Sequence, residues 1–287
     1  MKTSIYAIDG KKGSTIALPV QFAEEVRPDL IRRAVVSMQA NARQPYGAFP
    51  KAGQRPSAVL SRRRRKYKTS YGHGISRVPR KALWKRGRQF GWVGAFAPGM
   101  VKGRRAHPPK AQKIFAKSIN EGERRKAIRS ALAASVNIEW VKNRGHKVSE
   151  LPSVVEKKME KITKTSEVYE VLQRLQLGQE LDRVAGRKVR AGKGKLRGRR
   201  YKTKKGPLIV VAGACALLKA AHNIPGVDVC AVHQVNAERL APGGNPGRLT
   251  IYSEDAIARL EKEQLFMHKK NRRGKLEQRK DKGETKE

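Results

Sequence analysis

The chain has 287 residues and carries 65 Lys and Arg against 24 Asp and Glu, a formal net charge of +41. Because this charge far exceeds what solubility requires, it indicates a polyanionic partner. The longest apolar run, the 11 residues 208–218, is too short for a membrane span of roughly 20 residues. Asp9 interrupts the first apolar stretch, so no signal peptide is expected.

The first 43 residues predict two strands and a helix. Residues 4–8 and 15–18 are rich in strand-forming side chains and are joined by a turn at Asp9-Gly10. Pro28 suits the first position of a helix, and Asp29 is favourable near the positive end of the helix dipole. The apolar face of this helix is expected to consist of Leu30, Ile31, Ala34, Val35 and Met38.

Residues 44–110 show no helical or strand periodicity and predict a long loop. They contain 9 Gly, 7 Pro and 8 of the 16 aromatic side chains of the chain. Residues 30–120 carry 23 Lys or Arg and no Asp or Glu. Disorder is one interpretation, but disordered segments are usually poor in aromatics. Cations that bind phosphates and rings that stack on bases favour RNA binding, with the loop becoming ordered on the RNA.

Helical patterns return after the loop. Ser118 and Glu121 form a capping box that predicts the start of a helix. A further amphipathic helix has its apolar face at residues 168–175 and is expected to end at Gly178. The basic stretch that follows, residues 187–205, is again rich in Gly.

The last third alternates between strands and helices. Residues 208–212 form a continuous apolar run, which is typical of a parallel strand buried on both faces. Further strands are expected at residues 227–232 and 249–252, a helix at residues 215–221, and a final helix capped by Ser253. This order predicts an α/β fold, a three-layer α/β/α domain around a mainly parallel sheet.

The charge distribution predicts one body with basic additions. Residues 183–206 hold 12 basic and no acidic side chains, and residues 268–287 hold nine basic and four acidic ones. Outside these segments and the acid-free stretch the chain is nearly neutral. We therefore expect a single globular domain (1–43 and 111–265), an inserted extended loop (44–110), a basic RNA-binding segment (187–206) and a basic C-terminal tail (266–287).

The sequence contains no recognisable catalytic or cofactor motif. The Ala-Gly-Lys-Gly-Lys string at residues 191–195 lacks both the earlier Gly and the following Ser or Thr of a phosphate loop. The six His show no metal-ligand spacing, and Cys215 and Cys230 are expected to be buried, reduced thiols. We expect no cofactor, no metal and no enzymatic activity. An RNA-modifying enzyme would need an acid/base set, and a DNA-compacting protein would not explain the Gly- and Pro-rich aromatic loop.

Four strings in a fixed order carry a resemblance to a known family. They are Gln39-Ala40-Asn41 leading to Tyr46-Gly47, KGRRAHPPK at residues 102–110, RSALAAS at 129–135 and LAPGGNPGRLTIYSE at 240–254. These strings resemble the L-four family of large-subunit ribosomal proteins. The last string and the insertion in the loop are similar to the archaeal and eukaryotic branch. The likeness covers roughly residues 1–265.

The resemblance implies a globular domain on the outer side of the large subunit that binds rRNA early in assembly. It also implies that the long loop, residues 46–110 here, enters the RNA and forms part of the wall of the polypeptide exit tunnel. The run of four Arg and one Lys at residues 62–66 is richer in Arg than the family pattern. The implied partners are large-subunit rRNA, neighbouring ribosomal proteins and the nascent polypeptide, in the cytoplasmic ribosome and without a membrane.

Two sets of site residues follow. Residues near the tip of the loop are expected to line the tunnel: Gly72, His73, Gly74, Ile75, Ser76 and Arg77. Cations and rings of the loop and the basic segment are expected to bind rRNA: Arg43, Lys51, Arg55, Arg62, Arg63, Arg64, Arg65, Lys66, Tyr67, Lys68, Arg80, Lys81, Trp84, Lys85, Arg86, Arg88, Trp92, Lys102, Arg104, Arg105, His107, Lys110, Arg187, Lys188, Arg190, Lys193, Lys195, Arg197, Arg199, Arg200, Lys202, Lys204 and Lys205.

Overall fold

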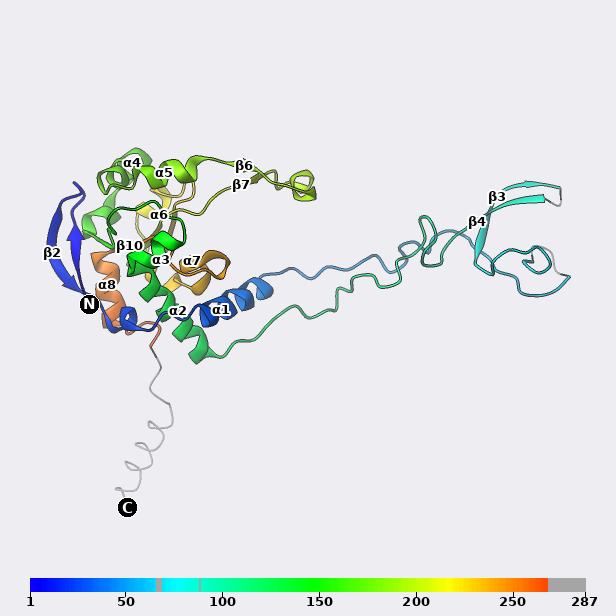
Figure 1. Ribbon diagram of the computed structural model, residues 1–287, viewed down its shortest axis with the longest axis horizontal. Helices are drawn as coiled ribbons and strands as arrows, with labels where there is room; N and C mark the ends of the chain where they lie inside the picture. The colour runs from blue at the N-terminus through cyan, green and yellow to red at the C-terminus, as the bar shows by residue number, and fades with distance from the viewer. Residues whose placement is uncertain (66–68, 88, 268–287) are drawn as a thin grey trace, which may run out of the picture. The chain divides into compact units, whose positions relative to one another are not determined.

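The computed structural model describes residues 1–65, 69–87 and 89–267 (Figure 1). Its chain divides into two compact units, one made of Met1–Asn41 with Lys117–Glu287 and the other of Ala42–Ala116. We call the described part of the first unit the body and that of the second unit the loop. Lys66, Tyr67, Lys68, Arg88 and the expected basic tail from residue 268 onward lie outside the described residues.

A six-stranded sheet in the order β2-β1-β5-β10-β8-β9 forms the centre of the body. β1 pairs antiparallel with β2, whereas all other neighbouring strands are parallel. The prediction of a mainly parallel sheet is therefore confirmed. The strands are β1 (Lys2–Tyr6), β2 (Lys12–Ala17), β5 (Val154–Val155), β8 (Leu208–Val211), β9 (Asp228–Ala231) and β10 (Thr250–Ser253).

Helices cover both faces of this sheet and create two apolar cores. Leu208 and Val210 of β8 pack into one core, while Ile209 and Val211 pack into the other. This alternation explains why β8 is apolar at every position and confirms the three-layer arrangement. The first core takes side chains from α1 (Pro28–Asn41), α2 (Glu121–Val136), α7 (Ala237–Leu240) and α8 (Glu254–Lys262), and the second from α3 (Ile138–Asn143), α4 (Thr165–Arg174), α5 (Gly178–Ala185) and α6 (Leu217–Ala220).

Two helix boundaries differ from the sequence prediction. The capping box at Ser118 and Glu121 is wrong, because Asn120 caps α2 and its Oδ1 accepts a hydrogen bond of 3.1 Å from the backbone N–H of Gly122. Gly178 does not end a helix but is the first residue of α5. By contrast, Ser253 caps α8 as predicted, because its Oγ accepts a hydrogen bond of 3.1 Å from Ala256 N.

The thiols differ in burial. Cys230 on β9 is buried as expected, whereas Cys215 is only partly buried, because it lies in the turn before α6.

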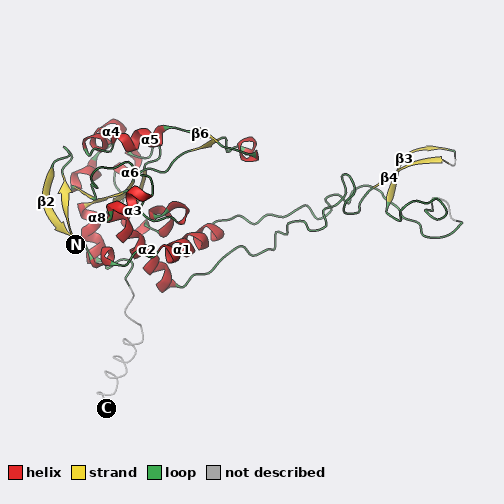
Figure 2. Cartoon of the chain, viewed as in Figure 1, coloured by secondary structure: helices red, strands yellow, loops and turns green. Residues whose placement is uncertain are grey.

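The loop contains a hairpin that the sequence did not predict (Figure 2). β3 (Arg80–Arg86) and β4 (Gln89–Gly94) pair antiparallel. The strands of this hairpin mix cationic, aromatic and glycine residues rather than alternating apolar with polar residues. For this reason the sequence periodicity did not reveal them. The chain segments on either side of the hairpin meet again near their ends, where the N–H of Ala48 donates to the carbonyl of Pro109 at 3.0 Å.

Candidate nucleic-acid interface

The basic segment of the body folds as a small hairpin, which we call the basic hairpin (residues 187–205). β6 (Lys188–Val189) and β7 (Tyr201–Lys202) pair antiparallel, and the 3-10 turn Lys193–Arg197 lies between them. The turn ends at Gly198, whose φ of 75° is a left-handed conformation that favours glycine. All the cations of this hairpin are exposed except Arg190, which is half-buried. The backbone therefore orders a set of cations and leaves their charged ends in solvent.

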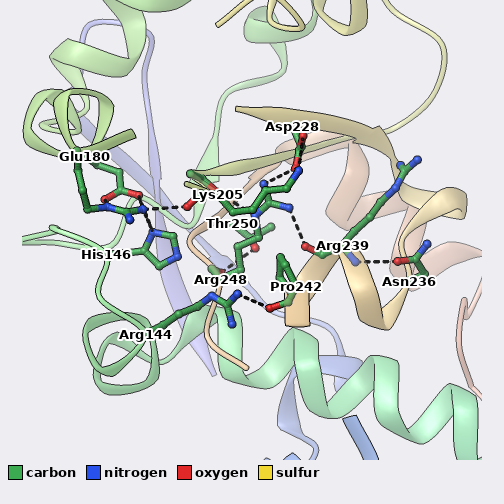
Figure 3. Close-up of polar contacts among 12 residues, drawn as sticks. Arg144, His146, Glu180, Lys205, Asp228, Asn236, Arg239, Pro242, Arg248 and Thr250 are labelled. Carbon is green, nitrogen blue, oxygen red and sulfur yellow. Dashed lines mark hydrogen bonds and ion pairs between the residues drawn. The ribbon is translucent and has the colours of Figure 1, made fainter. Parts of the chain in front are cut away.

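Two arginines of the body hold the C-terminal end of the basic hairpin (Figure 3). Arg183 Nη2 donates to the carbonyl of Lys205 at 2.9 Å, and Arg248 Nε donates to the carbonyl of Gly206 at 2.9 Å. Arg248 is only 1% exposed, and its Nη2 lies 2.6 Å from Oδ2 of Asp228. Burial lowers the pKa of Arg248, while the Asp228 carboxylate opposes that change. A buried charge with this many partners fixes the hairpin's attachment to the sheet.

Glu180 fixes Arg183 in turn. Its fully buried carboxylate accepts hydrogen bonds from Arg183 at 2.6 and 2.7 Å and from the Lys147 N–H at 3.1 Å, and it lies 2.6 Å from Nδ1 of His146. Burial alone would raise the pKa of Glu180. The hydrogen bonds from Arg183 and His146 instead lower this pKa to about 2. The carboxylate is therefore charged and holds the Arg183 side chain in place.

The PGGNPGR part of the fourth sequence string has a structural role beside this network. Arg144 donates one hydrogen bond of 2.7 Å to the carbonyl of Pro242 and another to the carbonyl of Asn245. Burial and the nearby cations of Arg248 and Arg183 lower the pKa of Arg144 to about 10. Gly247 has φ of 89° and lies against the backbone of Trp140, where a Cβ would be 2.6 Å from the carbonyl carbon. A side chain at this position would force the segment away from α3.

Cations of the loop lie against aromatic rings. The guanidinium carbon of Arg43 is 4.0 Å from the centre of the Phe115 ring, and that of Arg55 is 4.7 Å from the centre of Phe49. Tyr46 stacks on Phe115 with 5.8 Å between ring centres and 8° between planes. Since the sequence between residues 30 and 120 has no acid, the rings supply the negative potential that carboxylates supply elsewhere.

A cleft of about 740 Å³ lies at this end of the loop. It is lined by Tyr46 on the N-terminal side of the loop and by residues 105–113 on the C-terminal side, several of them cationic. A groove that combines an aromatic residue with cations suits a nucleic-acid strand. The lining residues are Tyr46, Arg105, Ala106, His107, Pro108, Pro109, Lys110, Gln112 and Lys113.

The expected rRNA-binding residues lie in two separate places, the loop and the basic hairpin. In the loop, Arg80, Lys81, Trp92 and Arg104 are half-buried, and the other expected residues that the structure describes are exposed. Those from Arg187 to Lys205 are exposed except for Arg190. Phosphate binding requires such exposed cations.

The six residues expected to line the tunnel form an exposed turn. Gly72 and Gly74 have φ of 77° and 61°, which only glycine adopts without strain. The guanidinium carbon of Arg77 lies 5.0 Å from the centre of the Tyr71 ring. His73 is exposed to solvent along with its neighbours in the turn.

Sequence reasoning missed several residues that build this surface. Phe115 and Tyr71, which lie against loop cations, and the anchors Arg183 and Arg248 were not among the expected site residues. The partners of Arg248 are 9, 20 and 42 positions away in the chain, so no local spacing could have identified them. Its place as an aromatic residue within the acid-free stretch 30–120 is a signal that could have pointed to Phe115.

Other site types find no support in the part of the chain that the structure describes. No group of three or more His, Cys, Asp or Glu there is arranged to hold a metal ion. Nor does any helix in these residues have the length and apolar character needed to cross a bilayer.

An α/β body with an acid-free basic loop and an anchored basic hairpin defines a class of protein, a globular domain with cationic extensions suited to a polyanion. The sequence matches the Ribosomal protein L4/L1 family over residues 16–263, and the chain belongs to this family. The resemblance drawn from the four strings is therefore confirmed.

Archaeal relatives align along almost the whole chain. Large ribosomal subunit protein uL4 of Nanoarchaeum equitans is 48% identical over 267 residues, which cover 93% of this chain and 100% of that protein. The protein of the same name from Methanosphaera stadtmanae is 44% identical over 264 residues, covering 90% and 96%. That of Archaeoglobus fulgidus is 43% identical over 259 residues, covering 90% and 97%.

Proposed function

We propose that this chain is a structural protein of the large ribosomal subunit in the cytoplasmic ribosome, where it binds rRNA and neighbouring ribosomal proteins. The observation that carries the proposal is the division of charge: the acid-free stretches 30–120 and 183–206 hold 23 and 12 Lys or Arg, whereas the chain outside them and the tail is nearly neutral. The names of the archaeal relatives support the same role. The family is one of structural proteins, which argues against an enzyme.

The exposed cations of the loop and the basic hairpin bind phosphates of large-subunit rRNA in this proposal. Phosphate contacts supply most of the affinity and fix the position of the protein without reading sequence. The body remains folded on its own two cores, and the two extensions reach separate stretches of RNA. Contacts with several RNA regions allow the protein to act early in assembly, because it can hold those regions together.

Residues 44–110 of the loop enter the rRNA and contribute to the wall of the polypeptide exit tunnel. The turn at residues 72–77 has three small side chains, one His and one Arg, and it is exposed in the structure. Small side chains let a backbone pass through a narrow RNA channel. Sparse charge can border an aqueous passage without holding the nascent polypeptide.

Co-sedimentation tests the ribosomal role. A tagged chain expressed in an archaeal host is expected to sediment with the large subunit at one copy per particle and to appear in its early precursor particles after a pulse label. A chain that stays at the top of the gradient at physiological salt would show that the ribosomal assignment is wrong.

A photo-crosslinker at His73 tests the tunnel position, with one at His107 as the matched control. In ribosomes stalled during translation, the probe at residue 73 is expected to capture the nascent polypeptide, whereas the probe at residue 107 captures RNA alone. Capture of RNA alone from both positions would remove residues 72–77 from the tunnel wall.

A further inference from the structure

The indole ring of Trp84 packs directly on a glycine of the β3–β4 hairpin. Trp84 pairs directly with Gly91 across the two strands. A Cβ at Gly91 would overlap Nε1 of Trp84 and would lie 2.5 Å from Cε2 and 2.7 Å from Cδ1. These atoms belong to the five-membered ring and are at similar distances, so the ring lies with its face over the glycine. Any larger residue at position 91 would displace the indole.

The other face of the Trp84 ring is open. The side chain is 55% exposed although one face rests on the backbone. Burial of both faces would be the ordinary result for a tryptophan that serves only to stabilise a hairpin. A ring that is fixed on one side and open on the other is instead a preorganised stacking surface, because little rotamer freedom remains to be lost when a ligand binds.

The residues around the ring are cationic. Directly paired residues of an antiparallel hairpin lie on the same face, and alternate residues of a strand share a face. Gln89 and Val93 are each two positions from Gly91, so their partners Arg86 and Lys81 lie on the same face as Trp84. Arg86 is exposed and Lys81 is half-buried. No acid occurs anywhere in residues 30–120. A ligand for this face must therefore combine a flat apolar surface with negative charge.

We propose that Trp84 stacks on one unpaired nucleobase, while Arg86 and Lys81 bind the adjoining phosphates and Gly91 acts as a positioning residue that seats the ring. This inference rests on the proposed function, since it takes the nucleic acid to be large-subunit rRNA. A nucleotide unites the π-face and the negative charge that the site requires. Stacking accepts any base, so the site recognises an unstacked nucleotide rather than a sequence.

Chemical probing of rRNA in purified large subunits tests the proposal. Subunits carrying W84A are expected to show one or a few adjacent nucleotides whose reactivity toward reagents for unpaired bases rises by about fivefold or more, which is the lower end of what losing a base–aromatic stack implies. W84F keeps a ring and is expected to give a smaller rise. L83A, which removes an apolar side chain that is 62% exposed on the same strand, is the matched control and is expected to change nothing there.

The role of Gly91 has its own readout. G91A is expected to raise the reactivity of the same nucleotides as W84A, and the double variant W84A/G91A is expected to match W84A alone. The backbone at Gly91 lies outside the positive-φ region, so Ala disturbs the site only through its Cβ. An added effect of G91A in the W84A background would show that Gly91 does not act through the ring.

Two outcomes overturn the proposal while the ribosomal role stands. One is W84A subunits that contain the chain at full occupancy and have unchanged rRNA reactivity. The other is a photo-crosslinker at residue 84 that captures a neighbouring protein instead of RNA. Loss of the wild-type chain from the subunit fraction is a different result, and it would contradict the proposed function itself.

Discussion

The body and the loop neutralise their cations in opposite ways. In the body, buried or half-buried arginines meet carboxylates: Arg129 lies 2.8 Å from Glu24, Arg183 lies 2.6 Å from Glu180 and Arg248 lies 2.6 Å from Asp228. In the loop, arginines such as Arg43 and Arg55 lie over rings. These arginines are therefore neutralised within the body, whereas the loop, like the exposed cations of the basic hairpin, retains a charge that only another molecule can neutralise.

Burial follows the same division. The body holds two apolar cores that together contain most of the buried side chains. Among the loop residues that the structure describes, Ala95 alone is buried. Fixing a backbone residue costs about 1–2 kcal/mol of conformational entropy, and one buried alanine cannot offset that cost over so long a segment. We therefore expect the body to fold by itself and the loop to become ordered on a partner.

Limited proteolysis of the RNA-free protein gives the largest contrast. A broad-specificity protease is expected to cut first within residues 44–110, then within residues 187–205, and at least about a thousandfold more slowly inside the body. The body opens only by unfolding, against a stability of about 5–15 kcal/mol, whereas segments without a core open at almost no cost. Protection of the loop before RNA is added would contradict the comparison.

Arg248 tests whether the body depends on its internal ion pairs. Arg248→Met is expected to lower the free energy of unfolding by about 3–5 kcal/mol, because it leaves Asp228 and the Gly206 carbonyl without their buried donor. Arg197→Ala removes an exposed cation of the basic hairpin and is expected to change stability by less than about 0.5 kcal/mol. Urea unfolding followed by circular dichroism measures both. Equal effects would mean that the network contributes no stability.

Glu180 gives the body a specific acid sensitivity. Its pKa falls from 4.5 to about 2 on folding. A depressed carboxyl pKa contributes stability that is present above pH 4.5 and is lost as the pH falls toward 2, here about 3 kcal/mol. Unfolding free energies measured from pH 7 to pH 2 are expected to show this loss in the wild type. The Glu180→Gln variant is expected to be less stable than the wild type at pH 7 and to lose less unfolding free energy between pH 7 and pH 2. If its stability instead fell in parallel with that of the wild type, other groups would cause the acid sensitivity.

The smallest expected effect concerns the charge of the loop alone. Replacing the four arginines at positions 62–65 by Ala is expected to weaken rRNA binding about tenfold at physiological salt. It is also expected to reduce the slope of log affinity against log salt by roughly 0.7 for each phosphate that the variant no longer neutralises. The matched control replaces four exposed lysines of the body, Lys157, Lys158, Lys161 and Lys164. Equal effects in filter-binding titrations would mean that net charge, rather than the loop, controls binding.

Local sequence patterns predicted the elements that have strong periodicity or a clear cap. The strand β8 was predicted from its continuous apolar run, and α8 from Ser253. The two-residue strand β5, which lies between β1 and β10, was missed because two valines carry no measurable period. Ser118 and Asn120 are both suitable cap residues, and the choice between them depended on where α2 begins. Capping preferences alone define the start of a helix only to within a few residues.

The site was less predictable than the fold. Which residues are cationic and exposed could be inferred from composition. Their organisation could not, because Trp84 is seated by Gly91 across a hairpin turn, and Arg183 is held by Lys205 across the whole basic hairpin. Such pairings are set by tertiary register, and a single sequence contains no record of them.

The fixed C-terminal end of the basic hairpin has a consequence for variation and engineering. Arg183 and Arg248 hydrogen-bond the carbonyls of Lys205 and Gly206, just before β8. The start of β8 is therefore fixed independently of the sequence between residues 187 and 204. We therefore expect changes in the length or sequence of the hairpin to leave the register of the sheet unaltered. The hairpin is also the natural position for grafting a peptide tag into the folded domain, since the insertion would be tolerated like a longer surface turn.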